Sequence, residues 1–230
     1  MNKMEKEIIT YGKFEKRIVE MAENKFKAHP AKRKKKYLID SNLGDVLEDL
    51  HRYLTLNESF EAFKDEDGRE RSLYKGIALW GNIGVGKSFL MELLANNSYR
   101  PFYFRCSSKV ASDYKKYGES VIDTYTDESF YTMLDKTSGA EIYNISKPKT
   151  YLFDDIGTEV STSSHYKNSE QVISRIIFDR NKLWNNHAMI THFTFNMSPD
   201  VFRKTYGEKL FDRIREMCNF VLLDGKTSKR

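Results

Sequence analysis

The sequence predicts an α/β domain in which helices flank a parallel five-stranded sheet. Three observations predict it. Short apolar runs alternate with helical stretches from residue 76 onward, a glycine-rich loop separates the first such run from a helix, and the hydrophobic share of 40% over 230 residues is enough for a core. Strands that alternate with helices imply right-handed crossovers and a sheet covered on both faces, with ligands bound at the carboxyl ends of the strands.

The individual elements follow from the spacing of apolar residues. Apolar positions three and four residues apart predict helices, and short continuous apolar runs predict buried strands. The expected strands are Gly76–Trp80, Pro101–Cys106, Thr150–Phe153, Ala188–Phe195 and Phe220–Leu223. The expected helices span residues 4–26, 43–54, 87–95 and 170–184.

The positive charge is concentrated near the N-terminus. Residues 1–37 hold 12 Lys and Arg against 5 Asp and Glu, a net charge of +7, so the remainder carries −2 of the total of +5. Most of this excess lies in the run Lys32-Arg33-Lys34-Lys35-Lys36, which follows the first predicted helix as a hinge. Such a run suits contact with phosphates, and it equally suits a solvated linker. We expect residues 1–40 to form a helical basic arm and linker.

Composition excludes several other classes of protein. Cys106 and Cys218 lie far apart and outside any metal-binding pattern, so we expect two buried thiols. No apolar run is long enough to cross a bilayer, and the start of the chain has no signal-peptide pattern. The expected location is the cytoplasm, with no membrane partner.

Residues 81–88 match the motif that binds nucleotide phosphates. The segment Gly81-Asn82-Ile83-Gly84-Val85-Gly86-Lys87-Ser88 fits GxxxxGK[ST] without a mismatch, after an apolar strand and at the start of a helix. Its backbone N–H groups and the helix N-terminus suit phosphate oxygens, while Lys87 suits the β- and γ-phosphates and Ser88 suits Mg²⁺. The predicted nucleotide-binding residues are Gly81, Asn82, Ile83, Gly84, Val85, Gly86, Lys87, Ser88 and Phe89.

Two carboxylates follow a later apolar strand. In Tyr151-Leu152-Phe153-Asp154-Asp155 the acids stand at the expected strand end. Asp154 suits Mg²⁺ held through water, because Mg²⁺ prefers hard oxygen ligands, and Asp155 suits a general base for an attacking water. A solvated acidic turn is the alternative interpretation.

Polar residues close the next strand as well. Asn196 ends the run Met189–Phe195, where its amide is able to hydrogen-bond the attacking water or the γ-phosphate, or to serve only as a turn residue. Ser198-Pro199-Asp200 then begins a helix. His192 alternates with core-facing residues, so we interpret it as structural.

Arg213 is the fourth candidate. It lies in the segment Tyr206–Cys218, where Leu210, Ile214 and Met217 share one helix face and leave Arg213 directed elsewhere. An arginine in this place is able to stabilise the charge that develops during phosphoryl transfer in a neighbouring subunit. From the residues alone, a surface or ion-paired arginine is the favoured interpretation.

These four segments together resemble the AAA+ ATPases of the DnaC/DnaI helicase-loader group and the related IstB transposition helpers. The resemblance covers about residues 70–224. The similar segments are Leu79–Leu90, Phe153–Glu159, Thr194–Ser198 and Tyr206–Cys218, which correspond to the phosphate loop, the acidic strand end, the sensor-1 segment and the block that carries an arginine finger. Arg213 falls on the finger position, and Arg180 matches a further arginine position in the helix before sensor 1.

The resemblance implies an AAA+ P-loop NTPase core over residues 41–230, without a C-terminal lid domain. It implies ATP and Mg²⁺ as cofactors, and it implies that Ser88 and Asp154 bind the metal. The catalytic residues that it implies are Lys87, Asp155, Asn196 and Arg213. It further implies ATP hydrolysis between subunits of a homo-oligomeric ring or spiral, with single-stranded DNA and a replicative hexameric helicase as partners. A helical insert facing DNA is expected within Lys109–Tyr143, where Lys109, Tyr114, Lys115, Lys116 and Tyr117 also fit an ordinary surface helix.

Three alternatives remain open. An IstB-like transposition helper that binds duplex DNA shares all four segments. A non-catalytic nucleotide-binding scaffold fits Asp155, which is shorter than the glutamate commoner in AAA+ enzymes. A P-loop kinase of small molecules would leave Asn196 and Arg213 without a role.

Overall fold

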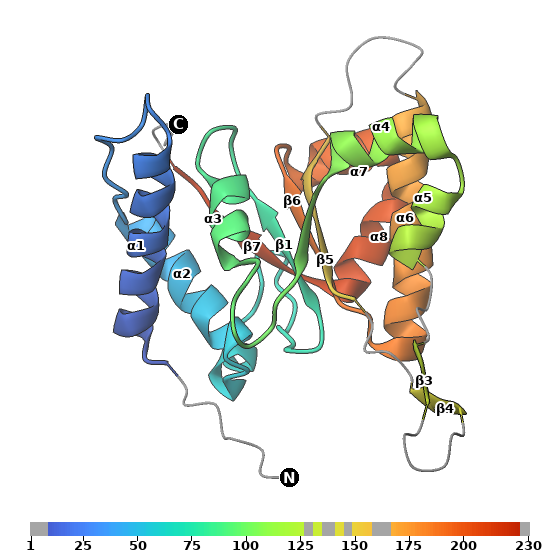
Figure 1. Ribbon diagram of the computed structural model, residues 1–230, viewed down its shortest axis with the longest axis horizontal. Coiled ribbons are helices and arrows are strands. Elements are labelled where there is room, and N and C mark those ends of the chain that lie inside the picture. Colours follow the sequence, from blue (N-terminus) through green and yellow to red (C-terminus); the bar gives the residue numbers. More distant parts are fainter. Residues whose placement is uncertain (1–8, 127–130, 135–140, 145–148, 158–166, 226–230) are drawn as a thin grey trace.

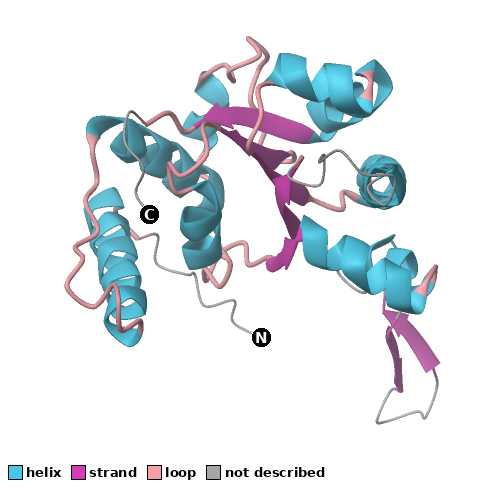
Figure 2. Ribbon diagram, turned by 90° about the horizontal axis from the view of Figure 1, so that it is seen from above, coloured by secondary structure: helices cyan, strands magenta, loops and turns pink. Residues whose placement is uncertain are grey.

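A five-stranded parallel sheet forms the centre of the molecule, with helices on both of its faces (Figures 1 and 2). The computed structural model describes residues 9–126, 131–134, 141–144, 149–157 and 167–225, and gives only the backbone path for residues 131–134, 141–144 and 167–171. The strand order is β2-β5-β6-β1-β7, so β1 lies between β6 and β7. The predicted α/β fold with a parallel five-stranded sheet is confirmed.

The elements follow one another as strand and helix over most of the chain. The strands of the main sheet are β1 (Gly76–Trp80), β2 (Tyr103–Cys106), β5 (Tyr151–Ile156), β6 (Thr191–Phe195) and β7 (Cys218–Leu222). The helices are α1 (Tyr11–Ala28), α2 (Ser41–Leu54), a 3₁₀ turn (Glu58–Ala62), α3 (Lys87–Leu94), α4 (Ser107–Tyr117), α5 (Ser120–Thr126), α6 (Lys167–His187), α7 (Pro199–Tyr206) and α8 (Glu208–Met217). A small antiparallel pair, β3 (Tyr131–Leu134) and β4 (Glu141–Asn144), completes the set.

The sheet buries two separate hydrophobic clusters, one on each face. Ile77 and Leu79 of β1 point to the face covered by α1, α2 and α3, whereas Ala78 and Trp80 point to the face covered by α6, α7 and α8. Trp80 lies between Phe195 and Phe220, with ring centroids 4.3 Å and 5.1 Å away and nearly parallel planes. Aromatic pairs of this kind add about 0.5–1.5 kcal/mol each beyond the area that they bury.

Helix α1 belongs to the first of these clusters. Its apolar residues recur at four-residue spacing, and Phe14, Ile18 and Ala22 pack with residues of α2 and α3. Figure 1 shows α1 on the side of the molecule where α2 and α3 lie. An ion pair of 2.7 Å between Lys25 and Glu92 ties α1 to α3 at the surface. The boundary between an arm of residues 1–40 and a domain of residues 41–230 stays a prediction, but α1 packs directly on the core.

The strands differ from the sequence prediction mainly at their ends. β5 continues through both aspartates to Ile156, and β6 begins at Thr191 because α6 runs on to His187. His192 is buried and its Nδ1 accepts a hydrogen bond of 3.0 Å from the backbone N–H of Ile77, which confirms the structural interpretation. Burial lowers the pKa of His192 to about 3, so the ring is neutral.

Arg180 and the two cysteines also have defined places. Arg180 is fully buried and donates to the Thr191 hydroxyl and to the carbonyls of Tyr125, Lys149 and Ile190, at 2.6 to 3.0 Å. It therefore connects α6 with the start of β6 and the end of α5. Both cysteines are free thiols; Cys218 is buried as predicted, whereas Cys106 is partly exposed, which corrects the expectation of two buried thiols.

The region of the expected insert begins with two short helices. Val110 belongs to the second cluster and Ala111 is buried, while Lys109, Lys115 and Lys116 are exposed. The remainder of the range to Tyr143 is described only as the backbone of β3 and part of β4, and residues 127–130 and 135–140 lie outside the described residues. Among the helices of the described ranges, none combines the length and the apolar character needed to span a bilayer.

Candidate nucleotide site

The phosphate loop connects the buried end of β1 to the first turn of α3. Gly86 stands directly before α3 with φ of 101°, a left-handed conformation that side-chain-bearing residues rarely adopt. Lys87 opens the helix and is only 3% exposed. Its ammonium donates hydrogen bonds of 2.8 Å to the carbonyls of Gly81 and Asn82, so the cation lies inside the curve of its own loop.

Asp154 lies beside this loop, at the carboxyl end of β5. It is 6% exposed, and its Oδ1 accepts a hydrogen bond of 2.6 Å from the hydroxyl of Thr194 on the neighbouring strand β6. Burial raises the pKa of Asp154 above its ordinary value, against the lowering effect of hydrogen bonds from Thr194 and Ser88. The hydrogen bond with Ser88 brings together the two residues that the sequence assigned to Mg²⁺.

Asp155 has an unusual backbone conformation. Its φ is 64°, in the left-handed region that few residues other than Gly, Asn and Asp adopt, and the β5–β6 register is irregular between Phe153 and Ile156. The backbone N–H of Asp155 donates to the Thr194 hydroxyl at 2.8 Å. One hydroxyl thus accepts from the backbone of Asp155 and donates to the carboxylate of Asp154. We infer that this irregularity turns the Asp155 side chain away from the regular pleat of the strand.

The backbone of Gly157, directly after β5, has a conformation that favours glycine. Its φ is 98°, and a Cβ at this position would stand 2.0 Å from the Cε of Met197, whose side chain would have to move. Asn196 directly follows β6, the strand that pairs with β5.

A cavity of about 340 Å³ opens over the phosphate loop. Asn196 contributes to it, as do several phosphate-loop residues, so the structure brings these predicted residues together. The residues that line the cavity are Phe26, Lys32, Tyr37, Gly84, Gly86, Lys87, Ser88, Phe89 and Asn196. Three of them, Phe26, Lys32 and Tyr37, come from the N-terminal arm and were not among the residues predicted from the sequence.

The arm side of the cavity is aromatic. The rings of Phe26 and Phe89 stack at 5.3 Å with an angle of 9° between their planes, and Tyr37 lies 5.7 Å from Phe89. Burial raises the pKa of Tyr37 to about 12, so its hydroxyl stays protonated. An apolar wall of this kind next to a phosphate loop is suited to the base and ribose of a nucleotide. Their mutual packing, rather than any local motif, places these side chains here.

Arg213 lies apart from this cavity, on α8. Its side chain is 43% exposed, and its guanidinium donates to both carboxylate oxygens of Glu216 at 2.8 and 2.9 Å. The amide of Asn181 on α6 donates to the same carboxylate at 3.1 Å. Arg213 is not among the described residues that line the cavity of its own chain. This position leaves it accessible to another molecule.

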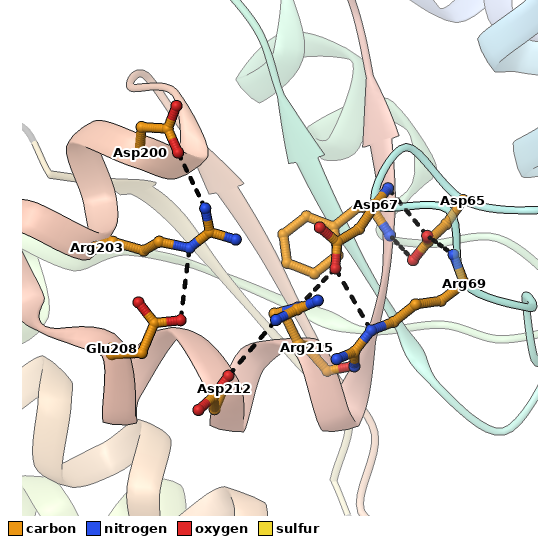
Figure 3. A network of polar contacts seen from close by, with 9 residues as sticks. Asp65, Asp67, Arg69, Asp200, Arg203, Glu208, Asp212 and Arg215 are labelled. Atoms are coloured by element: carbon orange, nitrogen blue, oxygen red, sulfur yellow. Dashed lines mark hydrogen bonds and ion pairs between the residues drawn. The ribbon is translucent and has the colours of Figure 1, made fainter.

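Helix α8 itself is firmly held, as Figure 3 shows. Arg215 donates to Asp67 at 2.6 Å, and Arg69 lies 3.4 Å from the same carboxylate, so α8 is joined to the loop before β1. At the other end, Arg203 of α7 lies between Asp200 and Glu208. Arg213 is therefore mounted on a helix that is fixed at both ends.

The donor set beside the phosphate loop fits Mg²⁺. Mg²⁺ keeps several waters and is usually held by one or two protein oxygens together with nucleotide phosphates. The Ser88 hydroxyl and the Asp154 carboxylate supply two hard oxygens in mutual contact. No group of three or more His, Cys, Asp or Glu suited to a metal occurs among the residues whose positions are described, so the pair alone would not form a complete metal cage.

Comparisons of sequence and of structure both find similarity to helicase loaders. No protein-family profile matches the chain. The replicative helicase loader DnaI of Bacillus subtilis is 26% identical over 167 residues, which cover 67% of this chain and 48% of the relative, so the chain spans about half the length of that curated protein. The crystal structure of the DnaC helicase loader matches with a TM-score of 0.50 and 16% identity, over 83% of this chain and 94% of that one.

Two further structures agree. The crystal structure of DnaI matches with a TM-score of 0.51 at 16% identity, over 84% of this chain and 87% of that one. A structure of DnaA from Aquifex aeolicus with bound AMPPCP matches with the same TM-score at 14% identity, over 84% of this chain and 50% of that one.

The sheet order, the phosphate loop and these likenesses define the class of the molecule. The fold is that of an AAA+ P-loop NTPase core. Within that class, the chain resembles the DnaC/DnaI helicase loaders, as the sequence predicts.

Proposed function

We propose that the chain is an ATP-dependent accessory ATPase of DNA replication, of the helicase-loader type. The observation that carries the proposal is the convergence of the phosphate loop, Asp154 and Asn196 at the carboxyl ends of β1, β5 and β6. The similarity to a curated replicative helicase loader favours this role over an IstB-like transposition helper. Nucleotide binding is supported by the fold and by the phosphate loop.

Each residue has a chemical task in this proposal. Backbone N–H groups of the loop bind phosphate oxygens, and the ammonium of Lys87 exchanges its two carbonyl partners for the β- and γ-phosphates. Asp155 accepts a proton from the attacking water, while the amide of Asn196 orients that water or the γ-phosphate. The Thr194 hydroxyl keeps both aspartates in place.

Ser88 and Asp154 would hold Mg²⁺, which would supply positive charge to offset the negative charge of the triphosphate. Burial of Asp154 strengthens this interaction because water screens it poorly there. The same burial disfavours the charged form of Asp154 and so raises its pKa. A bound cation would favour the charged form and would therefore lower this pKa.

The site is completed between subunits in this proposal. Arg213 of one subunit reaches the γ-phosphate held by the next, which implies head-to-tail contacts and hence a ring or an open spiral. The similarity to a replicative helicase loader supports contact with a hexameric replicative helicase. Assembly on single-stranded DNA is a further part of the proposal. Because the chain spans 48% of the length of DnaI, contact with the helicase is the part that the chain supports least directly.

DNA binding at a fixed salt concentration tests the proposed role. The protein is titrated against single-stranded and duplex DNA of equal length, each with ATP, with ADP and without nucleotide. We expect tighter binding of single strands in the presence of ATP. An ATP-dependent preference for duplex DNA would contradict the loader role and favour the transposition helper, and equal binding in all six conditions would contradict both.

A further inference from the structure

The basic run of the arm is attached to the nucleotide cavity at both of its ends. Lys32 begins the run and Tyr37 follows it directly, and both line the cavity. The four cations between them, Arg33, Lys34, Lys35 and Lys36, are exposed to solvent. The run is thus a short cationic loop whose flanking residues line the cavity and whose middle is exposed to solvent.

The backbone of this loop is folded rather than extended. The N–H of Lys32 donates to the carbonyl of His29 at 2.9 Å, and the N–H of Lys35 donates to the carbonyl of Lys32 at 2.8 Å. The run therefore contains two turns, and its role as a hinge stays a prediction. On the helix side, Phe26 anchors the loop by stacking on Phe89 of α3. In Figure 1 the connection from α1 to α2 and the loop from β1 to α3 lie at the same end of the molecule.

A nucleotide in the cavity would act on both attachment points. Lys32 and Lys87 both line the cavity, so the phosphates of a nucleotide bound there would attract the ammonium of Lys32 as well as that of Lys87. A base against Tyr37 and Phe89 would support the other end of the loop. The loop between the two points becomes more restricted once the nucleotide is bound.

We propose that Arg33–Lys36 form a contact for the phosphodiester backbone of single-stranded DNA, and that a nucleoside triphosphate in the cavity increases the affinity of this contact by fixing Lys32 and Tyr37. The proposal rests on the proposed nucleotide site. Four adjacent exposed cations match the charge and spacing of a nucleic-acid backbone and read no sequence. Because the coupling is reciprocal, DNA must also increase the affinity for the nucleotide by the same factor.

The experiment is a titration of a fluorescently labelled oligothymidylate with the full chain, followed by anisotropy at several salt concentrations. Each titration is made with Mg²⁺ and β,γ-methylene-ATP and without nucleotide. The test variant replaces Lys34, Lys35 and Lys36 by serine. The matched control makes the same change to serine at Lys13, Lys16 and Lys27, which are exposed lysines of α1. Both triple variants lose the same formal charge.

We expect the nucleotide to tighten DNA binding by the wild-type protein about 5- to 150-fold, the usual range of coupling between two sites. The test variant should lose most of this gain, and its salt dependence should fall by about two counterions, at about 0.7 per phosphate contact. The control variant should keep the gain. Lys32→Ala, which removes one attachment point, should reduce the gain while Arg33–Lys36 remain present.

Three results would overturn the inference. The gain could persist in the test variant, or the control variant could lose it equally, or the wild-type protein could bind phosphatidylserine vesicles more tightly than DNA at the same salt concentration. A parallel titration with a fluorescent ATP analogue separates the two proposals. Absence of nucleotide binding by the wild-type protein would contradict the proposed function itself, whereas normal nucleotide binding with an unaltered DNA gain in the test variant would contradict only the coupling.

Discussion

Two cations assigned to the same triphosphate stand in contrasting regions of the molecule. Lys87 is 3% exposed, at the start of α3, and its ammonium is surrounded by carbonyls of its own loop. The side chain of Arg213 is 43% exposed, on α8, and its partner is Glu216 on the same helix. The first is fixed by its own strand and loop, whereas the second presents its charge to the outside.

The proposed function gives these two cations different tasks. Lys87 would serve the nucleotide bound by its own chain, because it lies inside the phosphate loop. Arg213 would serve a nucleotide bound by another chain, because it is exposed and lies outside the cavity of its own chain, on a helix that is held to the loop before β1 and to α7 (Figure 3). Substitutions of Lys87 and of Arg213 should therefore have different effects. The first should abolish nucleotide binding within the same chain, whereas the second should lower the rate of hydrolysis at a site that another subunit holds.

The largest effect is expected inside the chain. Lys87→Ala should remove nucleotide binding and turnover together, and Asp155→Asn should remove turnover while nucleotide binding survives, each with a loss of more than about 10³-fold in the rate of ATP hydrolysis. A steady-state phosphate-release assay with nucleotide titrations checks both. Lys13→Ala, on the exposed side of α1, serves as the control. Activity that survives both substitutions would show that the site is assigned wrongly.

A smaller and more selective effect is expected at α8. Arg213→Ala should lower kcat by about 10³-fold, the lower end of the range for arginine fingers, and leave the affinity for the nucleotide within about 2-fold. The reason is that Arg213 acts on charge that develops only during transfer. Arg175→Ala, an exposed arginine of α6 that pairs with Glu119, is the matched control. A weakened nucleotide affinity with normal kcat would contradict the assignment.

The smallest effect concerns the hydroxyl that joins the two aspartates. Thr194→Val leaves the carboxylate of Asp154 and the N–H of Asp155 without this partner, so we expect a loss of about 10- to 100-fold in activity and about 1–3 kcal/mol in the free energy of unfolding. Thr194→Ser retains the hydroxyl and should restore most of both. Denaturant unfolding and the ATPase assay are the measurements, and equal behaviour of the two variants would show that the hydroxyl has no role.

The sequence predicts well those features that depend on neighbours in the chain. The phosphate loop and the acidic strand end are local patterns, and a parallel sheet brings strand ends together, so the meeting of Ser88, Asp154 and Asn196 could be expected. The left-handed conformation of Asp155 could not be expected, because it depends on a register irregularity between β5 and β6. Polarity alone does not single out Thr194, because Thr191 and His192 of the same strand are polar as well.

The position of the N-terminal arm could not be predicted from the sequence. Its basic run and its aromatic residues are visible in the sequence, but their relation to the nucleotide depends on how α1 packs on α3. No local pattern in residues 26–37 indicates that Phe26 stacks on Phe89, which lies more than 60 residues further along. A segment that the composition presents as an appendage therefore forms one wall of the cavity.

The most direct test of the division between Lys87 and Arg213 is a subunit-mixing assay. Arg213→Ala protein and Lys87→Ala protein, each inactive alone, are combined at several ratios and ATP hydrolysis is measured. The shared site predicts partial recovery, greatest near equal amounts, because intact nucleotide sites of the first variant meet intact arginines of the second. No recovery at any ratio would contradict a site shared between subunits and would place any action of Arg213 within its own chain.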